Sequence, residues 1–272
     1  MVVQHNVTAM NANRQLGITT GIQAKSSEKL SSGYKINRAA DDAAGLAISE
    51  KMRRQIKGLT QASANAQDGI SAVQTAEGAL NEVHEMLQRM DELATKAANG
   101  TLQTEDRNYI QQEVNALVSE INRTASTTKF NDTGLLSGYN ATLQVGADNG
   151  TDDRISISIT NMNADTIGAN TTKVNLTTQS GAQTAIDNIK GAIKSVSSQR
   201  ADLGAVQNRL EHTIKNLDNV NENTVSAESA IRDTDMASEM VKYSNNNILA
   251  QAGQSMLAQA NQTNQGVLSL LG

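Results

Sequence analysis

Histidines and carboxylates are the side chains of this 272-residue chain that could do chemistry, and they are sparsely placed. The histidines are His5, His84 and His212, and His84 has two carboxylates near it, Glu82 and Glu85. A zinc site would need a second histidine or a cysteine at ligand spacing, and the sequence has no cysteine. It also lacks a phosphate-binding glycine-rich loop and a nucleophile elbow. We therefore expect neither an enzyme nor a cofactor, and interpret His84 as a helix-surface residue and His212 as a helix-packing residue.

Two short clusters of charged residues are the other candidates for polar chemistry. They are Arg38, Asp41 and Asp42 in one place and Arg232, Asp233 and Asp235 in another. The two neighbouring aspartates of the first cluster could form a carboxylate pair for acid–base chemistry. Each cluster also suits a polar elbow between a terminal helix and the middle of the chain. We favour the elbow and expect ion pairs across it, which would set its angle rather than add much stability.

Apolar side chains repeat with helical spacing along three long segments. Between Leu46 and Ala98 they recur every seven residues, at Met52, Leu59, Ala66, Val73, Leu80, Leu87 and Ala94. Similar stripes follow at residues 105–125 and from residue 184 to about 223, the latter at Ile189, Val196, Leu203, Leu210 and Leu217. No proline interrupts them. Such stripes are typical of long helices that pack side by side, so we expect an antiparallel bundle.

The middle of the chain has a different pattern. Apolar and polar residues alternate with period two at residues 142–145 and 155–159, and Asp148-Asn149-Gly150 between them favours a turn. This predicts a β-hairpin at about residues 140–160. Residues 161–181 are rich in Asn, Thr and Gly and are interpreted as an irregular loop.

Each end of the chain carries one further helix. An amphipathic helix is expected from Asn6 to Leu30, where Ser31-Ser32-Gly33 interrupts it. Residues Tyr243 to Gly272 form another helix that has no charged side chain. Because a surface helix normally carries Lys and Glu on its polar face, this neutral helix needs close neighbours. We expect the two helices to pair as an antiparallel coiled coil that is fully buried in an assembly.

These elements predict a mainly α fold, with a long antiparallel helical bundle, a small β-hairpin region and a terminal two-helix coiled coil formed by the N- and C-terminal segments. We expect a discontinuous coiled-coil domain of residues 1–42 and 235–272 and a bundle domain of residues 43–234.

The net charge of −5 argues against nucleic-acid binding. The sequence has no 18-residue apolar run for membrane insertion. The N-terminus lacks the apolar stretch of a secretory signal, so we expect any export to need no cleaved signal peptide.

Four long motifs follow one another along the chain. The first is EKLSSGYKINRAADDAAGLAISEKMRRQIKGL, from Glu28 to Leu59. The others are SSQRADLGAVQNRLEHTIKNL, ESAIRDTDMASEM and NNNILAQAGQSMLAQANQTNQGVLSLL, in this order between Ser197 and Leu271. Together these motifs closely resemble the signatures of bacterial flagellins. The resemblance implies a structural subunit that is exported and polymerises into the flagellar filament, the helical propeller for swimming. It also implies a short form that lacks large outer domains.

The resemblance implies roles for the domains as well. The terminal helices form an inner tube around a channel, and the bundle with its hairpin forms an outer tube. The residues implied in self-assembly and channel lining are Ile248, Gln251, Gln254, Met256, Leu257 and Gln259. The implied partners are further copies of the chain, a flagellar export chaperone, the export apparatus, and the filament cap and hook-junction proteins. The implied location is the extracellular flagellum.

A further implication is recognition by the vertebrate Toll-like receptor that senses flagellin. The residues that match the family's receptor-contacting surface are Gln88, Arg89, Leu93 and Glu113. Asp91 departs from it, because many strongly sensed members carry arginine there. Leu87 and Leu93 could instead serve helix packing.

Two other classes of function compete with a filament subunit. Long heptad stripes also occur in non-polymerising signalling or membrane-active helical proteins, such as the cytoplasmic hairpins of chemoreceptors. Those functions would need a membrane span or a longer apolar stretch than this sequence contains. An enzyme is the more distant alternative, because no constellation of residues could carry its chemistry. Sedimentation of the purified chain, with and without filament seeds, separates the first two classes.

Overall fold

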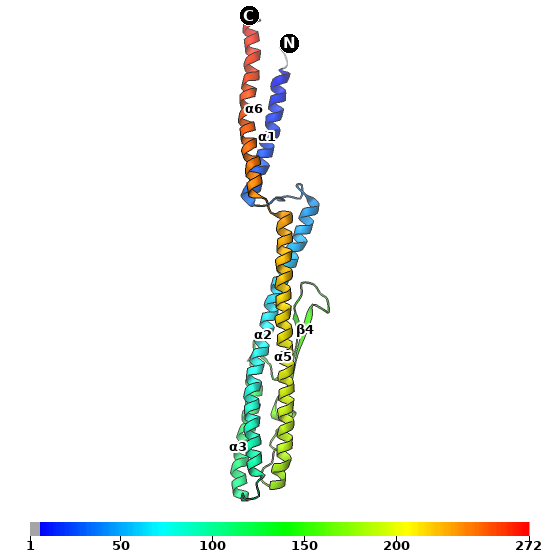
Figure 1. Cartoon of the computed structure of the whole chain (residues 1–272), viewed down its shortest axis with the longest axis vertical. Coiled ribbons are helices and arrows are strands. Elements are labelled where there is room, and N and C mark those ends of the chain that lie inside the picture. Colours follow the sequence, from blue (N-terminus) through cyan, green and yellow to red (C-terminus); the bar gives the residue numbers. More distant parts are fainter. Residues whose placement is uncertain (1–5, 272) are drawn as a thin grey trace. The chain divides into compact units, whose positions relative to one another are not determined.

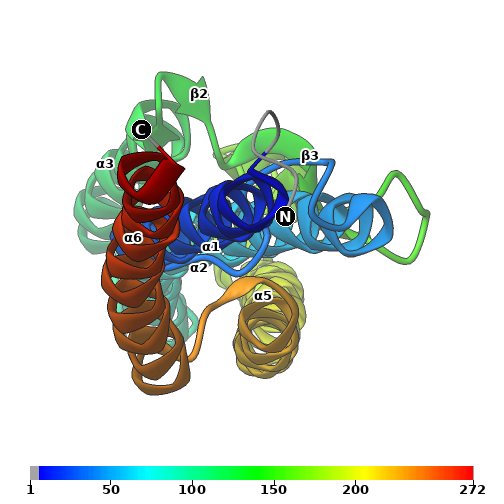
Figure 2. The same ribbon diagram turned by 90° about the horizontal axis from the view of Figure 1, so that it is seen from above.

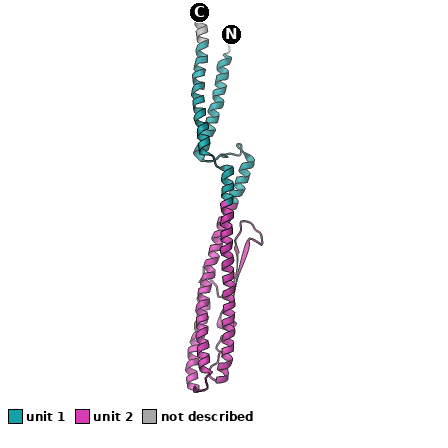
Figure 3. Cartoon of the chain, in the orientation of Figure 1, with its two compact units in different colours: residues 1–54, 223–272 teal, residues 55–222 magenta. Residues whose placement is uncertain are grey.

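The computed structural model describes residues 6–271, and the chain divides into two compact units (Figures 1 and 3). Unit 1 comprises residues 1–54 and 223–272, so it is built from both ends of the chain, and unit 2 comprises residues 55–222. Helices α2 (Ala43–Ala97) and α5 (Gln179–Arg232) contribute residues to both units. The division therefore falls within these two helices, whereas the domain boundaries expected from the sequence lie at the elbow.

Unit 2 is a helical bundle built on the apolar stripes. Helices α2, α3 (Thr104–Thr127) and α5 contribute to one core, in which Leu80, Leu87 and Leu203 are at most 1% exposed. The stripe of α2 is buried from Leu59 onward, and that of α5 is buried throughout. Seven-residue spacing keeps these side chains on one face of each helix. The prediction of a mainly α fold with a helical bundle is confirmed.

A β-hairpin covers part of this bundle. Strands β3 (Ser137–Gln144) and β4 (Arg154–Asn161) pair antiparallel. In β4 the side chains of Ile155, Ile157 and Ile159 are at most 3% exposed, while the residues between them face solvent. The predicted hairpin is confirmed. A smaller pair, β1 (Lys129–Phe130) with β2 (Thr133–Gly134), was not predicted.

The segment after the hairpin is more ordered than an irregular loop. It contains the short helix α4 (Ala164–Ile167), which Asn163 caps by accepting a hydrogen bond from the Thr166 N–H at 2.8 Å. Val174 and Leu176 are completely buried in the core of the bundle. The loop prediction is therefore wrong in one respect, because these few apolar side chains close the core while the polar ones around them face water.

Three close contacts join the hairpin to α2. A methyl group at Gly69 of α2 would overlap Leu143 of β3, and one at Gly58 would lie 2.8 Å from Cβ of Ala147 in the hairpin loop. Asn65, between these glycines on α2, donates from Nδ2 to the Gln144 carbonyl oxygen at 3.0 Å. Residues 58, 65 and 69 share one face of a helix, so this face accepts the hairpin at close range.

In unit 1, α1 (Val7–Ser32) and α6 (Met236–Leu271) run antiparallel and lie side by side in both views (Figures 1 and 2). Asn6 caps α1 by accepting the Ala9 N–H at 3.0 Å and also donates from Nδ2 to the Ala260 carbonyl oxygen of α6 at 3.0 Å. Gly33 ends α1 with a left-handed backbone at φ 76°. The predicted pairing of the terminal helices, and the interruption at Gly33, are confirmed.

Candidate assembly surface

Unit 1 has almost no apolar core of its own. Among its residues whose side chains the structure describes, the buried apolar ones are Ile36 and Ala250. Large apolar side chains on both terminal helices are instead exposed: Val7, Met10, Ile18 and Ile22 on α1, and Met236, Met240, Val241, Ile248, Leu249 and Met256 on α6. Exposed apolar residues concentrated on two adjacent helices mark an interaction surface. We call these ten residues the assembly surface.

The predicted self-assembly residues of α6 fall into two groups. Ile248 and Met256 are 63% and 65% exposed and belong to the assembly surface, and Leu257 is half-buried. The glutamines Gln251, Gln254 and Gln259 are also exposed. The structure thus presents both the apolar and the neutral polar residues of this helix to its surroundings.

The contact between α1 and α6 includes a buried polar pair that the sequence did not suggest. Ser26 is 4% exposed and Glu239 is 6% exposed. The Ser26 hydroxyl, which hydrogen-bonds to the Glu239 carboxylate, lowers the pKa of Glu239, and Lys242 at 3.4 Å assists. Such a pair leaves no periodic signal, because the two residues lie far apart in the sequence and each is ordinary on a polar helix.

The elbow of unit 1 is organised by its aspartates. Asp42 caps α2 by accepting the Gly45 N–H at 2.9 Å, and Asp235 caps α6 by accepting the Ala237 N–H at 3.0 Å. Asp41 accepts the Arg38 N–H at 3.0 Å, and this hydrogen bond holds the pKa of Asp41 below its usual value. Because Asp41 and Asp42 each serve separate backbone groups, they do not act as a carboxylate pair.

The arginines of the elbow reach partners outside the two predicted clusters. Arg232 Nη1 lies 2.7 Å from Glu50 Oε1 and its guanidinium stacks 4.9 Å from the Tyr34 ring centroid. This ion pair lowers the pKa of Glu50. Arg38 pairs with Glu28 at 3.0 Å. Asp233 accepts the hydroxyl hydrogen of Ser229 at 2.7 Å.

Main-chain hydrogen bonds join the two strands of the elbow. The Lys35 N–H donates to the Arg232 carbonyl oxygen at 2.6 Å, and the Thr234 N–H donates to the Gly33 carbonyl oxygen at 2.9 Å. These bonds and the Glu50–Arg232 pair connect positions about 180 residues or more apart, since Glu50 and Arg232 are separated by 182 positions. Sequence spacing could not have identified such partners.

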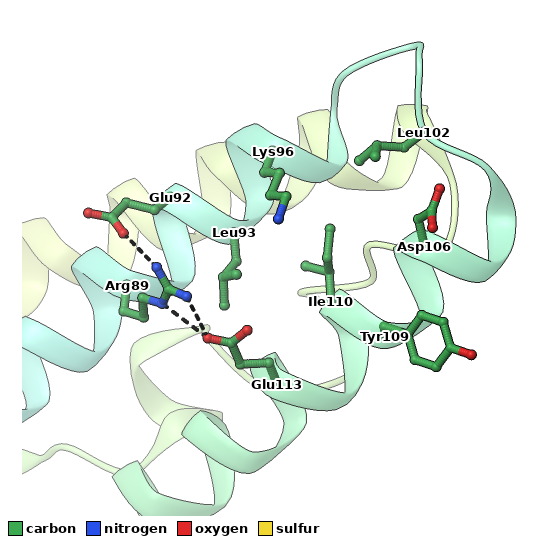
Figure 4. Close-up of a pocket in the computed structure, with 9 residues that line it drawn as sticks. All are labelled: Arg89, Glu92, Leu93, Lys96, Leu102, Asp106, Tyr109, Ile110 and Glu113. Atoms are coloured by element: carbon green, nitrogen blue, oxygen red, sulfur yellow. Dashed lines mark hydrogen bonds and ion pairs between the residues drawn. The ribbon is translucent and has the colours of Figure 1, made fainter.

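A groove of about 540 Å³ lies between α2 and α3 in unit 2 (Figure 4). Its lining is Arg89, Glu92, Leu93, Lys96, Leu102, Asp106, Tyr109, Ile110 and Glu113. Leu93 and Ile110 are buried at 4% and 7% exposure, whereas Tyr109 is 69% exposed. The groove therefore has an apolar floor and a charged rim.

One end of this groove is closed by a charged triad. Arg89 donates from Nε and Nη2 to Glu113 Oε1 at 3.0 and 2.9 Å, and from Nη1 to Glu92 Oε2 at 3.1 Å. The carboxylates, Glu113 first, raise the pKa of Arg89 above its usual value. Three of the four predicted receptor residues thus line one groove. Gln88 points elsewhere and contacts His84 Nε2 at 3.0 Å.

The three histidines lie in different environments. His84 is half-buried on α2. His212 is exposed, so its interpretation as a packing residue is wrong: it lies two positions beyond the buried Leu210 and therefore on the other side of α5. His5 lies outside the described residues. Within residues 6–271 no cluster of three metal-ligating side chains occurs, and no helix is long and apolar enough to cross a membrane.

Comparison with known proteins gives consistent matches at both ends of the chain. Residues 3–141 match the bacterial flagellin N-terminal helical region, and residues 186–271 match the bacterial flagellin C-terminal helical region. The flagellin of Halalkalibacterium halodurans is 54% identical over the whole of both chains. A flagellar filament 31.3 kDa core protein of Treponema maltophilum is 50% identical, and the flagellin of Bacillus subtilis is 48% identical, again over the whole of each chain.

One solved structure agrees with this at the level of fold. A flagellar hook-associated protein from Vibrio parahaemolyticus has a TM-score of 0.58 and 15% identity, covering 71% of this chain and 100% of that one. The crystal structure of Bacillus cereus flagellin has 28% identity and a TM-score of 0.49, covering 57% and 88%. The chain therefore belongs to the bacterial flagellin family, whose members are structural proteins that self-polymerise into the flagellar filament.

Proposed function

We propose that the α1–α6 pair forms the inner tube of the filament and that the assembly surface is buried there against neighbouring subunits. The observation that carries this proposal is the contrast within unit 1, where the ten large apolar side chains of the assembly surface are exposed, while Ile36 and Ala250 are the buried apolar residues among those whose side chains the structure describes. Fully burying one large aliphatic side chain is worth about 1.5–3 kcal/mol. Because these side chains are 47–68% exposed, polymerisation would add about half of this free energy at each of the ten positions.

The polar face of α6 suits the wall of a central channel. Gln251, Gln254 and Gln259 are exposed, and residues 243–272 carry no charge. Amide side chains keep a wall hydrated, while the absence of charge avoids electrostatic capture of unfolded subunits that pass through. The filament as a whole then acts as the propeller for swimming.

A charge placed on this wall tests the proposal. Gln254→Glu should reduce export or filament length and hence swimming. The far-UV circular dichroism spectrum of the monomer should stay unchanged, because the helices of unit 2 are unaffected. Gln112→Glu introduces the same charge at an exposed position of α3 and serves as the control. If bacteria carrying Gln254→Glu swim and assemble filaments as well as those with Gln112→Glu, the channel-wall assignment is incorrect.

We also propose export and end-capping partners, which the family resemblance and the exposed terminal helices support. Before assembly, the assembly surface needs protection, which an export chaperone on α6 would give. The export apparatus would then deliver the chain to the extracellular flagellum without a cleaved signal peptide. Cap and hook-junction proteins would contact the same surface at the two ends of the filament.

The groove in unit 2 supports a second function, recognition by the vertebrate Toll-like receptor that senses flagellin. Arg89 is 51% exposed at its side chain, and Glu113 orients it with two hydrogen bonds. Pre-oriented guanidinium groups favour tight recognition because less side-chain entropy is lost on binding. Leu93 would act mainly by packing, since it is 4% exposed.

Substitution at Arg89 tests receptor recognition. Arg89→Ala should weaken receptor affinity by about tenfold or more, consistent with an arginine at an interface centre. Arg123→Ala, at an exposed arginine of α3 that pairs with Glu120, is the control. Equal receptor affinity of the wild type and Arg89→Ala would remove that residue from the interface.

A further inference from the structure

Methionine is concentrated on the assembly surface. Four of its ten residues are methionines, Met10 on α1 and Met236, Met240 and Met256 on α6. Their exposed fractions lie between 49% and 68%. Because the whole chain has nine methionines, nearly half of its thioether sulfurs belong to this one surface.

The other methionines whose side chains the structure describes are shielded. Met90 and Met162 are buried in the core of unit 2 at 0% and 3% exposure. Met52 and Met86 are half-buried. A reagent that attacks sulfur from solution therefore meets the methionines of the terminal helices first, because the reactivity of a sulfur side chain depends on its exposure.

Two of the exposed methionines face the same stretch of the α1–α6 pair from opposite helices. Asn6 donates from Nδ2 to the Ala260 carbonyl oxygen at 3.0 Å. Met10 and Met256 each lie four residues from this contact, and because the helices run antiparallel both positions fall at the same level. The other two exposed methionines of α6 are one helical turn apart at its start. A change at these sulfurs thus alters the assembly surface on both helices and toward both ends of α6.

Sulfur is the position at which a peroxide reacts most readily with this chain, because the sequence has no cysteine and no tryptophan. Hydrogen peroxide transfers one oxygen atom to a thioether: the O–O bond breaks, an S–O bond forms, and the sulfur loses two electrons. The second oxygen of the peroxide is reduced and leaves as water, so the reaction needs no other reactant. The product, methionine sulfoxide, is polar where the thioether was apolar and flexible.

We propose that the four methionines of the assembly surface form a redox-sensitive modification site, at which oxidation of the free subunit by a peroxide blocks its addition to the filament. This inference rests on the proposed burial of the assembly surface between subunits. A sulfoxide oxygen needs a hydrogen-bond donor, and burial against apolar side chains leaves it without one. In the filament the same thioethers are covered, so oxidation acts on unassembled subunits and spares those already in place.

Polymerisation of oxidised full-length monomer on short untreated seeds tests the proposal. Treatment with hydrogen peroxide, followed by its removal, should raise the critical concentration measured by sedimentation by about tenfold or more. Peptide mass spectrometry should locate the added oxygen at the four exposed methionines and leave Met90 and Met162 unmodified. Reduction by methionine sulfoxide reductases should then return the critical concentration to within about twofold of its starting value.

A variant without these four sulfurs is the matched control. The variant Met10→Leu/Met236→Leu/Met240→Leu/Met256→Leu keeps apolar side chains of similar volume. Whatever its critical concentration before treatment, the same peroxide treatment should change that value by less than about twofold.

Four results would overturn the proposal. In the first, the four exposed methionines of the monomer are not oxidised. In the second, monomer that carries the four sulfoxides polymerises at its untreated critical concentration. In the third, reduction of the sulfoxides gives no recovery, and in the fourth, peroxide inhibits the leucine variant as strongly as the wild type.

Peroxide treatment of preformed filaments distinguishes this inference from the proposed function on which it rests. If the assembly surface is buried, its methionines should be oxidised at least about tenfold more slowly in filaments than in free monomer. Equal rates would show that the surface is not buried, which removes the proposed inner-tube role and this inference with it. Slow oxidation in filaments, combined with normal polymerisation of oxidised monomer, would overturn the redox inference alone.

Discussion

Gly58 of α2 should tolerate no larger side chain, although glycine is usually a weak residue in a helix. A Cβ at this position would lie 2.8 Å from Cβ and 3.2 Å from Cα of Ala147. Comfortable carbon–carbon contacts are about 3.5–4.0 Å. Since the obstruction includes backbone, the hairpin loop must move away from α2. Overpacking of this kind costs about 1–3 kcal/mol.

The same substitution at Gly78 provides a matched control in the same helix. No atom lies within 4 Å of a Cβ placed there. Gly78→Ala should therefore show the helix-propensity gain alone, about 0.5–1 kcal/mol of added stability. Gly58→Ala has the same gain in helix propensity, but the clash with Ala147 lowers its stability. It should therefore be less stable than Gly78→Ala by about 1–3 kcal/mol.

Denaturant unfolding of the monomer, followed by circular dichroism, measures both variants. A third variant, Gly58→Ala/Ala147→Gly, removes the opposing methyl group and should recover at least half of the loss, as coupling between contacting residues requires. If Gly58→Ala is as stable as Gly78→Ala, the hairpin loop does not sit on α2 as described. The same conclusion follows if Ala147→Gly gives no recovery.

Two further predictions concern buried polar groups. Gln199 accepts the Thr160 N–H at 3.2 Å and donates to the Ser158 carbonyl oxygen at 3.1 Å, so Gln199→Leu should destabilise unit 2 by about 1–3 kcal/mol in denaturant unfolding. An unchanged midpoint would show that water replaces the side chain. Glu239 has a lowered pKa, mainly because of the Ser26 hydroxyl. Its stabilising effect on the α1–α6 pair is therefore complete above its ordinary pKa near 4.5 and is lost as pH falls through the lowered value. Hydrogen exchange of α1 in filaments should rise in that acidic range, and Glu239→Gln should abolish this component; an identical pH profile in both would contradict it.

Periodicity predicted the elements of unit 2 because burial there is repeated. Leu59, Leu80 and Leu203 each belong to stripes in which every seventh residue meets the core, and Ile155 to Ile159 alternate across a half-buried sheet. The segment around Val174 and Leu176 escaped prediction because two buried side chains in a polar stretch make no period. The β1–β2 turn has Asn131 and Asp132 at positive φ, which is a feature that the residue types permit but do not specify.

The candidate sites were predictable to a smaller degree, because their partners lie far apart in the sequence. The elbow clusters were recognisable as short runs of charge, but the pairing of Arg232 with Glu50 and Tyr34 depends on how distant helices end and begin. The resemblance to flagellins identified Arg89 and Glu113 as candidate receptor-contacting residues. Their direct hydrogen bonds, and the involvement of Glu92, follow from the packing of α2 on α3.

The placement of apolar residues explains why polymerisation and folding of the terminal helices should be one process. Unit 2 buries its stripes internally, so its helices are ordered in a single copy. In unit 1, ordering the 36 residues of α6 costs about 1–2 kcal/mol per residue in backbone entropy. Ile248 and Met256 are 63% and 65% exposed, so most of their apolar surface offsets this cost only when a neighbour covers it. Because assembly orders α6, the ordered fraction of α6 rises with subunit concentration by mass action. Amide exchange across residues 248–270 should be fast in the free monomer and slow in the filament, whereas exchange around Leu80 and Leu203 should be slow in both. Strong protection of residues 248–270 in dilute monomer would mean that α6 is stabilised within its own chain, and the inner-tube proposal would then lose its physical basis.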